Sequence, residues 1–496
     1  MLSLIVFLPL AAAVMLVTVP RLGDAAARWF WVAVASVDLA LVVVVWARYR
    51  APHANALAFE EKARWIPGVN SSYHIGVDGL SLPLVAMTAV IFLACAIYGL
   101  RSVDRPRLQA ALFLFLQTVS LGLFVAADLI LFFVFFDLSI VAMYFAIAGW
   151  GHGDAGRSAM KFFLYTFLGS LALLVGFIGL YVAADPHTFD MVQLAATTPL
   201  AGSSLAGGLV LAAILLGLAV KTPTFPFHTW LPPAHTDAPA IGSAVLAGVL
   251  LKMGTYGFVR IAMPMLPQAW RAWAWVIIAV GVVSVLYGAL VALAQDDVKR
   301  MIAYTSVNHM GYIVLAVGAA GLLSHGIADA RSVAVTGAVT QMVSHGLITA
   351  ALFLLSGVFY DRAASYDMGA YGGLAGPAPK LAALFAVGAF ASLGLPGFSG
   401  FIAEFQIFTG SIAAAPVTAV ALPGILITAA LFLRALQRIF TGPTGGHSAG
   451  FADLRKAELV SAAMLLALSV AIGLFPRPLL DVIEPAAHTL VDLVGR

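Results

Sequence analysis

Six ionisable residues lie inside long apolar stretches, where a charge is tolerated only if it is paired or functional. Asp137 lies in LILFFVFFDLSIVAMYF, Lys221 in LAVKTPTFPFHTWLPPAH and Lys252 in AVLAGVLLKMGTYGF. A charge at the centre of a bilayer costs at least about 2.5 kcal/mol on insertion scales, so each one needs a reason. The other three are His309 in SVNHMGY, His345 in MVSHGLITAALF and Glu404 in LGLPGFSGFIAEF.

Carboxylates, amines and imidazoles share one chemical ability, which is to gain or lose a proton. A series of such groups through an apolar bundle is what a proton path requires. Each residue also has a structural interpretation. A lone histidine in a membrane helix is more often a hydrogen-bonded packing residue than a proton carrier, and Lys252 could extend its amine to the surface if its helix ended nearby. The strongest structural alternative is an Asp137–Lys221 ion pair that joins two helices. Six groups in six helices exceed what packing requires, which favours a proton path.

Other chemistry has little support in the sequence. Cys95 is the single cysteine and lies in an apolar run, so the chain contains neither a disulfide nor a thiolate metal site. His228 and His235 are seven residues apart beside prolines, which is a poor spacing for a metal. We find no glycine-rich phosphate loop and no nucleophile motif, and therefore expect no bond chemistry in this chain.

The composition indicates what surrounds these residues. Of the 496 residues, 62% are apolar and 10% are charged, whereas a soluble domain has about 25% charged residues to solvate its surface. The chain is therefore predicted to be an all-α polytopic membrane protein. Its net charge of +3 is too small to indicate nucleic acid as a partner.

Helix by helix, the sequence predicts about 14 transmembrane segments, because a bilayer requires about 20 apolar residues per helix. The first segment has no preceding basic residue and is interpreted as an uncleaved span. The twelfth is too long for one straight helix and has Pro396 in its middle. The segments are residues 2–20, 28–47, 80–100, 109–125, 127–150, 159–183, 205–226, 240–262, 273–294, 300–320, 333–358, 380–411, 414–440 and 457–476.

Loop charges predict the orientation of the chain. With the N-terminus outside, the inner loops collect more than half of the 26 Lys and Arg residues, as the positive-inside rule requires. Both termini are therefore predicted to lie outside.

Two of the predicted spans are interrupted next to a charge. Pro223 and Pro226 follow Lys221, and a Gly/Pro-rich stretch from Gly394 to Gly400 precedes Glu404. A proline removes a helical hydrogen bond and frees carbonyl groups near the charge. Broken helices in both halves of a transporter indicate inverted repeats, here two five-helix repeats of helices 4–8 and 9–13 with helices 7 and 12 broken. The predicted domains are residues 1–108 (helices 1–3), 109–262 (first repeat), 273–440 (second repeat) and 457–496 (helix 14 and tail).

Five motifs also carry a resemblance to a known family. The stretches GVDGLSLPL, AVKTPTFPFHTWLPPAHTDAP, GSAVLAGVLLKMGTYGFVR, AQDDVKRMIAYTSVNHMGY and SLGLPGFSGFIAEF resemble the antiporter-like subunits of respiratory complex I, which are related to Mrp antiporter subunits. The resemblance covers roughly residues 76–438. The chain resembles the subunit M type for two reasons. The L and N types typically have lysine at the position of Glu404, and only twenty residues follow the fourteenth helix here.

Two positions depart from the family pattern. The fifth-helix motif usually begins FFE but reads FFD here, so that Asp137 is one methylene shorter than the usual glutamate. The loop motif usually reads LPDAH followed by glutamate, whereas this chain has Pro233 and Asp237 at those positions. The first departure changes the reach of the carboxylate towards Lys221, and the second changes a loop contact.

The resemblance implies a role for each ionisable residue. Asp137 would control Lys221, Lys252 and His309 would carry protons with His345 beside them, and Glu404 would deliver to the outlet. No cofactor is expected in this chain, while NADH, FMN, iron–sulfur clusters and quinone would be bound by partner subunits. The expected partners are the other membrane subunits, especially the L- and N-type antiporter-like subunits.

Residue usage rich in Ala, Gly and Val suggests the inner membrane of a bacterium. Two alternatives remain open. One is a subunit of an Mrp-type antiporter or a membrane-bound hydrogenase, and the other is a structural membrane anchor whose channel is inactive.

Overall fold

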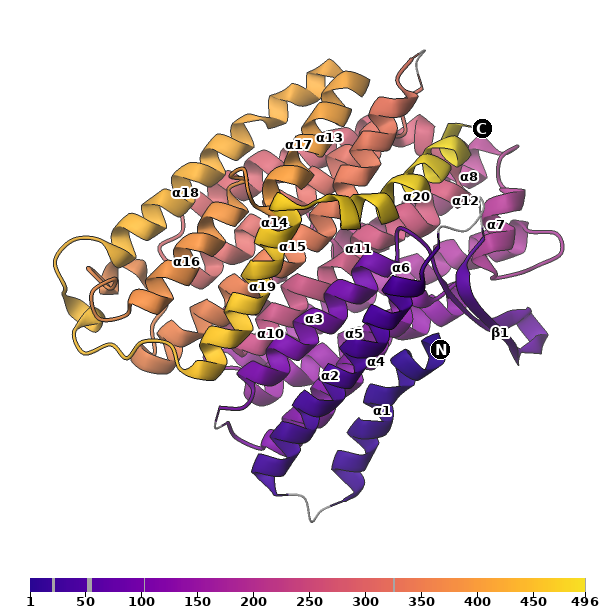
Figure 1. Ribbon diagram of the computed structural model, residues 1–496. Helices are drawn as coiled ribbons and strands as arrows, with labels where there is room; N and C mark the ends of the chain where they lie inside the picture. The colour runs from indigo at the N-terminus through magenta and orange to yellow at the C-terminus, as the bar shows by residue number, and fades with distance from the viewer. Residues whose placement is uncertain (20–22, 51–55, 102, 324–325, 496) are drawn as a thin grey trace.

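The computed structural model describes residues 1–19, 23–50, 56–101, 103–323 and 326–495, and these form a bundle of helices (Figure 1). In this part of the chain, ten helices are long and apolar enough to cross a membrane, and three shorter apolar helices accompany them. Each of the fourteen predicted segments coincides with helical structure. The corresponding elements are α1 (Leu2–Thr18), α2 (Asp24–Arg48), α3 (Leu82–Tyr98), α4 (Pro106–Val125), α5 (Leu129–Trp150), α6 (Ala155–Ala183), α8 (Ser204–Lys221), α10 (Ala240–Val245) with α11 (Leu251–Gly257) and α12 (Met263–Met265), α13 (Pro267–Leu293), α14 (Val298–Ala319), α15 (Ala328–Ala363), α16 (Pro379–Ser392) with α17 (Ser399–Ala414), α18 (Pro423–Phe440) and α19 (Lys456–Leu474).

The core of the bundle surrounds α15. Its most apolar stretch is entirely buried, and it packs against α3, α10, α14, α16, α17, α19 and α20. Residues 334–359 of this helix are buried, and all of them except Gln341 and His345 are apolar or small, as expected for a helix without a lipid-facing side. Side chains that α15 presents to the centre are therefore shielded from both water and lipid.

Both predicted broken helices are interrupted where the sequence places the prolines and glycines. Helix α8 ends at Lys221, and the short helix α9 (Leu231–Asp237) begins after residues 222–230. The carbonyl of Val220 accepts a hydrogen bond from Trp230 Nε1 at 2.9 Å, which replaces the helical bond that the break removes. Helices α16 and α17 are separated by residues 393–398, in which Gly394 and Gly397 have φ angles of +75° and +98°. Glycine is required at such angles because a side chain would clash with the backbone.

The eighth predicted span contains a different irregularity. Two π-helical turns, Leu246–Leu250 and Phe258–Ala262, lie on either side of α11. A π turn widens the helix and leaves carbonyl groups without their usual partners, and such turns are frequent at functional sites. They flank Lys252.

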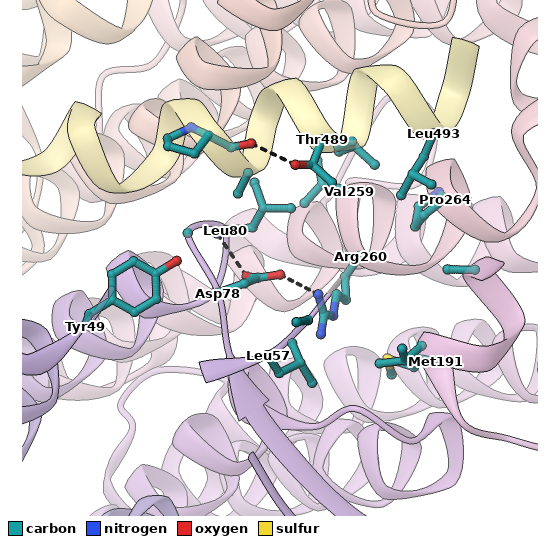
Figure 2. Close-up of a pocket in the computed structure, with 17 residues that line it drawn as sticks. Tyr49, Leu57, Asp78, Leu80, Met191, Val259, Arg260, Pro264, Thr489 and Leu493 are labelled. Carbon is teal, nitrogen blue, oxygen red and sulfur yellow. Dashed lines mark hydrogen bonds and ion pairs between the residues drawn. The ribbon is translucent and has the colours of Figure 1, made fainter. Parts of the chain in front are cut away.

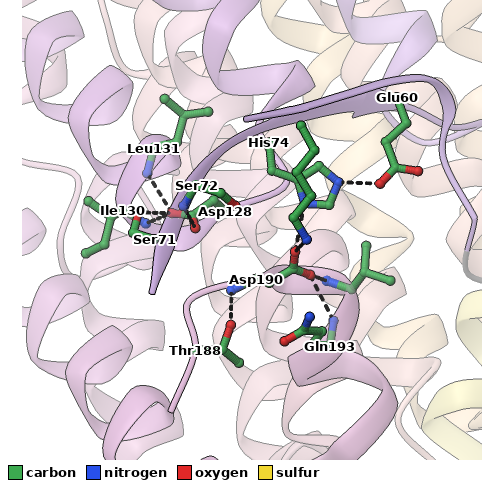
Figure 3. Close-up of polar contacts among 12 residues, drawn as sticks. Glu60, Ser71, Ser72, His74, Asp128, Ile130, Leu131, Thr188, Asp190 and Gln193 are labelled. Atoms are coloured by element: carbon green, nitrogen blue, oxygen red, sulfur yellow. Dashed lines mark hydrogen bonds and ion pairs between the residues drawn. The ribbon is translucent and has the colours of Figure 1, made fainter. Parts of the chain in front are cut away.

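A two-stranded antiparallel sheet was not predicted from the sequence. Strands β1 (Ala58–Ile66) and β2 (Ser71–Val77) form a hairpin between α2 and α3. Figure 3 shows how it is held. Asp128, which caps α5, accepts hydrogen bonds from Ser71 Oγ and from the backbone N–H of Ser72 at 2.9 and 3.0 Å. The hairpin is thus attached to the first turn of a membrane-spanning helix.

Asp190 provides the second anchor of the hairpin. It caps the short helix α7 (Met191–Thr197), and its carboxylate lies 2.6 Å from Lys62 Nζ and 2.8 Å from His74 Nδ1 (Figure 3). Although burial acts to raise the pKa of Asp190, the hydrogen bonds from His74 and Lys62 hold that pKa well below its usual range. The carboxylate therefore stays ionised and keeps its two basic partners.

The last helix, α20 (Arg477–Gly495), occupies the segment that the sequence analysis treated as a tail. Its buried residues recur at helical spacing along one face, while the opposite face is polar. It packs on α15, α13, α12 and α3, and Figure 1 shows it crossing the bundle as the yellow helix that ends at the C-terminus. Its side chains that face the bundle are Leu479, Ile483, Ala487, Leu490, Val491 and Val494.

Candidate functional site

Lys221 is the last residue of α8 and is buried at the break of the helix. Its Nζ donates a hydrogen bond to Ser139 Oγ at 3.1 Å and lies 4.8 Å from the centre of the Phe136 ring. Both partners belong to α5, the helix that carries Asp137. The amine is therefore held by a hydroxyl group and an aromatic face rather than by a carboxylate.

Asp137 and Lys221 are not joined by an ion pair, because no N–O distance between them is 4.0 Å or less. One carboxylate oxygen of Asp137, Oδ1, is buried without a hydrogen-bond partner. This geometry argues against the structural alternative of an ion pair that joins α5 to α8. The gap between Asp137 and Lys221 agrees with the short side chain of aspartate, because the glutamate usual in the family would reach about one methylene further.

Lys252 lies on α11 between the two π turns. Its Nζ donates a hydrogen bond to Ala247 O at 2.5 Å and lies 2.7 Å from His345 Nδ1. Ala247 belongs to the first π turn, so the irregular helix provides the carbonyl that holds the amine. Lys252 is fully buried, and no other charged residue lies within seven positions of it in the sequence. The alternative of a surface-seeking lysine is therefore wrong.

A continuous series of protonatable groups extends from Lys252. The rings of His345 and His309 have centroids 5.3 Å apart, and His309 Nε2 lies 3.6 Å from Glu404 Oε1. His309 Nε2 is also 3.1 Å from the carbonyl of Ser392, the last residue of α16. The second break therefore provides a carbonyl to His309 in the way that the π turn provides one to Lys252.

Glu404 lies within α17, close to the glycine-rich break. A methyl group at Gly394 would approach Glu404 Oε2 to 2.5 Å, so any larger residue at this position would have to displace the carboxylate. The phenylalanines next to Glu404 on α17 differ in burial. Phe408 is buried, whereas Phe405 is 60% exposed and points away from the core. Its helical position, one residue after Glu404, rotates it towards the outside of the bundle.

A small cavity lies among these groups. It is lined by His309, His345 and Glu404 together with other polar and apolar residues. The other lining residues are Gln341, Ser344, Ile348, Thr349, Ala391, Ser392 and Gly400. The volume of the cavity is about 10 Å³. This is at the lower limit for one water molecule. His309 Nδ1 and His345 Nε2 are buried without protein partners.

Hydroxyl groups continue from this cavity towards α19. Ser344 Oγ lies 2.8 Å from Ser399 Oγ, which lies 2.8 Å from Ser469 Oγ. All three serines are buried. A hydroxyl can donate and accept at the same time, so this series links α15, α17 and α19 by hydrogen bonds.

Four of the six predicted residues thus form one connected group, and the other two form a separate group. Lys252, His345, His309 and Glu404 are in sequential contact, whereas Asp137 and Lys221 lie at the first break. Helices α8 and α11 pack together, and a methyl group at Gly254 of α11 would overlap the hydroxyl of Thr222. That hydroxyl is buried and unpaired, so a polar atom lies between the two groups.

Two buried groups, His235 on α9 and Lys299 on α14, were not selected as members of the path from the sequence. His235 was considered only as a metal ligand, but it is fully buried, stacks on Phe353 and has no partner for either ring nitrogen. Lys299 Nζ donates to the carbonyl of Ala238 at 2.6 Å and to Tyr366 Oη at 3.2 Å. Burial and the nearby Lys299 lower the pKa of His152, in the loop before α6, to about 4, so His152 is neutral. The signal for His235 was present, because it lies in the same broken-helix motif as Lys221.

Asp38 is a further ionisable residue in the middle of a predicted span, and it was not selected from the sequence. It lies in α2, in the run WVAVASVDLALVVVV, and is fully buried. The signal was the same as for Asp137, which is a carboxylate in the middle of an apolar run. Unlike the six selected residues, it lies outside the two predicted repeats.

A larger pocket lies on the side of the hairpin and α20 (Figure 2). Its volume is about 130 Å³, and its lining includes Tyr49, Asp78, Arg260 and Thr489. Asp78 and Arg260 form an ion pair at 2.6 Å. Among the described residues, no group of three or more His, Cys, Asp or Glu side chains is placed to hold a metal ion. The series from Lys252 to Glu404 consists of groups that can each take up and release a proton.

The comparisons with known proteins agree with this geometry. The family model described as NADH:quinone oxidoreductase/Mrp antiporter, TM, matches residues 126–431. The chain belongs to this family of antiporter-like membrane proteins. Within the family, it is 37% identical over 443 residues to NADH-quinone oxidoreductase subunit M of Rickettsia prowazekii, covering 88% of this chain and 87% of that protein.

Two further relatives extend the similarity to almost the whole chain. NAD(P)H-quinone oxidoreductase chain 4 1 of Nostoc sp. is 37% identical over 503 residues, covering 98% of this chain and 91% of that protein. A chain of respiratory complex I from Thermus thermophilus with bound NADH has a TM-score of 0.90 and 30% identity over the full length of both chains. The predicted resemblance to subunit M of complex I is confirmed.

Proposed function

We propose that this chain is a proton-translocating membrane subunit of a respiratory NADH:quinone oxidoreductase, of the subunit M type. The observation that carries the proposal is the connected series from Lys252 through His345 and His309 to Glu404, with contacts of 2.7 Å and 3.6 Å at its ends. Every member is buried, and every member can take up and release a proton. The relatives are subunits of oxidoreductases, which supports the same assignment.

In the proposed path, Lys221 exchanges protons at the first break and Asp137 controls its charge. Lys252, His345 and His309 carry the proton through the centre, and Glu404 delivers it towards the outlet. The carboxylate of Asp137 acts on Lys221 across a gap rather than through a direct pair, because Ser139 holds the amine. The dielectric constant is low in the buried centre of the bundle, so the interaction between Asp137 and Lys221 depends strongly on their distance. A small movement of α5 against α8 would therefore change the charge of Lys221.

Two five-helix repeats organise this path in the proposal. Residues 109–262 form the first repeat and residues 273–440 the second, preceded by helices 1–3 in residues 1–108 and followed by residues 457–496. The support is that each repeat contains one broken helix, α8–α9 and α16–α17, with an ionisable residue next to the break. Inverted repeats of this kind place coupling sites near the middle of the membrane.

The energy for transport would come from other subunits. NADH, FMN, iron–sulfur clusters and quinone would be bound there, and the neighbouring L- and N-type antiporter-like subunits would contact this chain in the inner membrane of a bacterium. Both termini would face outside. Two sets of contacts support a common end for the termini. The amino group of Met1 pairs with Glu61 of the hairpin, which is anchored to Asp190 at the start of α7. At the other terminus, α20 packs on α12, which contacts α7. An antiporter or hydrogenase complex would be identified instead by Mrp-type or hydrogenase subunits that co-purify with the chain.

The decisive experiment is the Lys221→Ala variant of the whole complex, reconstituted in proteoliposomes. We expect proton uptake to be severely reduced while the complex assembles normally, because Lys221 lies at a helix break where packing requires no cation. Lys380→Ala, which alters an exposed lysine, is the matched control and should pump like the wild type. Wild-type pumping by the Lys221→Ala complex would remove Lys221 from the path.

A further inference from the structure

Asp38 is a buried carboxyl group that the proposed proton path does not use. It lies about midway along α2 and has an exposed fraction of 0%. Its side chain faces α4, where it meets Gln117, which is also fully buried. Both residues precede the first repeat or lie in its first helix, away from the six residues of the path.

The hydrogen bonds at this pair do not suit an ionised carboxylate. One oxygen of Asp38, Oδ2, lies 2.6 Å from the side-chain amide of Gln117. The other oxygen, Oδ1, has no partner, and neither has Gln117 Oε1. A carboxylate has two oxygens that accept several hydrogen bonds, and a buried one that receives a single amide donor is poorly stabilised.

No positive charge compensates Asp38. In the described part of the chain, no nitrogen of a Lys, Arg or His side chain lies within 4.0 Å of its carboxyl oxygens. Because Asp38 is completely covered by this chain, a cation from a neighbouring subunit has no access to it either. An ionised Asp38 would be an unpaired charge in the middle of the membrane.

The contact distance fits a protonated acid. An O–H···O bond has a usual length of about 2.5–3.0 Å, whereas an N–H···O bond is usually about 2.7–3.2 Å. The oxygen and nitrogen of a glutamine amide can exchange places by rotation of the side chain. With the amide turned, Gln117 Oε1 occupies the position 2.6 Å from Asp38 and accepts a proton from the carboxylic acid.

We propose that Asp38 is a proton-binding site that stays occupied, so that a neutral carboxylic acid donates a hydrogen bond to Gln117 and joins α2 to α4. Its ligand is a single proton, which is held and not passed on. The pair is a neutral interhelical hydrogen bond, a common means of joining membrane helices. The two mid-membrane aspartates of this chain then have opposite requirements, because Asp38 needs its proton and Asp137 needs its charge.

The same substitution at both positions tests this difference. Asp38→Asn keeps the shape, remains neutral and can still donate to Gln117, so this complex should assemble and pump within about twofold of the wild type. Asp137→Asn, the matched control, should impair pumping; that arm depends on the proposed function. Loss of assembly or of pumping in Asp38→Asn would overturn the protonated state.

Infrared spectroscopy supplies a measurement that does not depend on transport. In the resting wild-type complex labelled with ¹³C-aspartate, we expect a carbonyl band of a protonated acid that is absent from Asp38→Asn and persists at alkaline pH. Gln117→Leu should shift this band, because the acid loses its acceptor. Identical spectra for wild type and Asp38→Asn would overturn the proposal, and so would an Asp38 band that changes during turnover, since the proton would then be passed on.

Discussion

At the scale of single residues, the path is held together by carbonyl groups that irregular helices release. Lys252 is bonded to Ala247 O in a π turn, and His309 lies beside Ser392 O at the end of α16. A regular helix would use both carbonyls internally. The amine and the imidazole are therefore fixed by the backbone, while their remaining atoms face other titratable groups. The irregular parts of the helices therefore orient the proton-carrying side chains.

Asp137 should respond differently to loss of charge and to a change of length. Asp137→Asn removes the negative charge that favours protonated Lys221, so we expect strongly reduced proton uptake by proteoliposomes. Asp137→Glu should be far milder, because the charge is kept and the added methylene extends towards Lys221. An Asn variant with unimpaired transfer would contradict the coupling between these residues.

Glu404 should depend on its ability to exchange a proton. Glutamine has almost the same shape but cannot take up and release a proton, so Glu404→Gln should strongly lower translocation without loss of assembly. Glu404→Lys should keep some activity, because an amine can also relay protons. If Glu404 were only a hydrogen-bond partner for packing, glutamine would be harmless in the same proton-uptake assay.

The residue types of the path could be predicted from the sequence, but their connections could not. A charge in an apolar run is visible in one dimension, and this found Asp137, Lys221 and Glu404. The direct neighbours Lys252 and His345 are 93 positions apart, and only the packed helices bring them together. The Asp137–Lys221 gap was equally invisible, because it depends on how α5 rotates against α8. Asp38 carried the same signal as Asp137 but lay outside the motifs that carried the resemblance.

At the scale of elements, the breaks were predictable because proline and glycine act locally. Pro223 and Pro226 mark the end of α8, and Gly394 and Gly397 mark the gap before α17. The π turns around Lys252 have no such marker, since their sequences are ordinary apolar helix. The hairpin was also missed, because β1 and β2 are stabilised by side chains of α5 and α7 rather than by a strong strand pattern of their own.

Gly394 should be sensitive to substitution for two separable reasons. Alanine at this position must adopt a left-handed conformation, which costs roughly 1–2 kcal/mol, and its methyl group would also displace the Glu404 carboxylate. Gly397→Ala is the matched control, because it has a positive φ but open space around the added methyl group. We expect Gly394→Ala to lose clearly more proton uptake than Gly397→Ala at equal assembly. Equal losses would attribute the effect to backbone strain alone.

At the scale of the whole molecule, elements outside the bundle connect parts that are distant in the sequence. The hairpin connects α5 and α7 through Asp128 and Asp190, and α20 packs on α15, α13, α12 and α3. The positions and order of the helices follow from hydropathy, which explains why the bundle could be predicted helix by helix. The placement of α20 could not, because an amphipathic helix shows which face is apolar but not which neighbours cover it.

The anchor at Asp190 gives the hairpin a defined pH dependence. Because its pKa is lowered in the folded state, its contribution to stability is fully present above the ordinary aspartate value of about 3.9 and is lost as the pH falls below it. Asp190→Asn should abolish that contribution, which we expect to be about 1.5–3 kcal/mol for charge-assisted hydrogen bonds. Thermal unfolding in detergent measures the loss, and hydrogen exchange over residues 58–77 locates it.

Glu60 provides the control for this anchor. It contacts the other side of the His74 ring and is 48% exposed, so Glu60→Gln should change stability by no more than about 1 kcal/mol. If both variants lowered the melting temperature equally, the exposed and buried partners of His74 would be equivalent and Asp190 would not be the anchor.

The small cavity among His309, His345 and Glu404 also predicts how the rate of transport depends on water activity. A cavity of about 10 Å³ holds at most about one water molecule, so in this structure the space among these three residues does not hold a column of solvent. Lowering the water activity with an osmolyte that cannot enter the protein should therefore slow pumping with a shallow dependence, equivalent to a few waters at most. A steep dependence, equivalent to tens of waters, would mean that the helices around this cavity separate widely in every transport cycle.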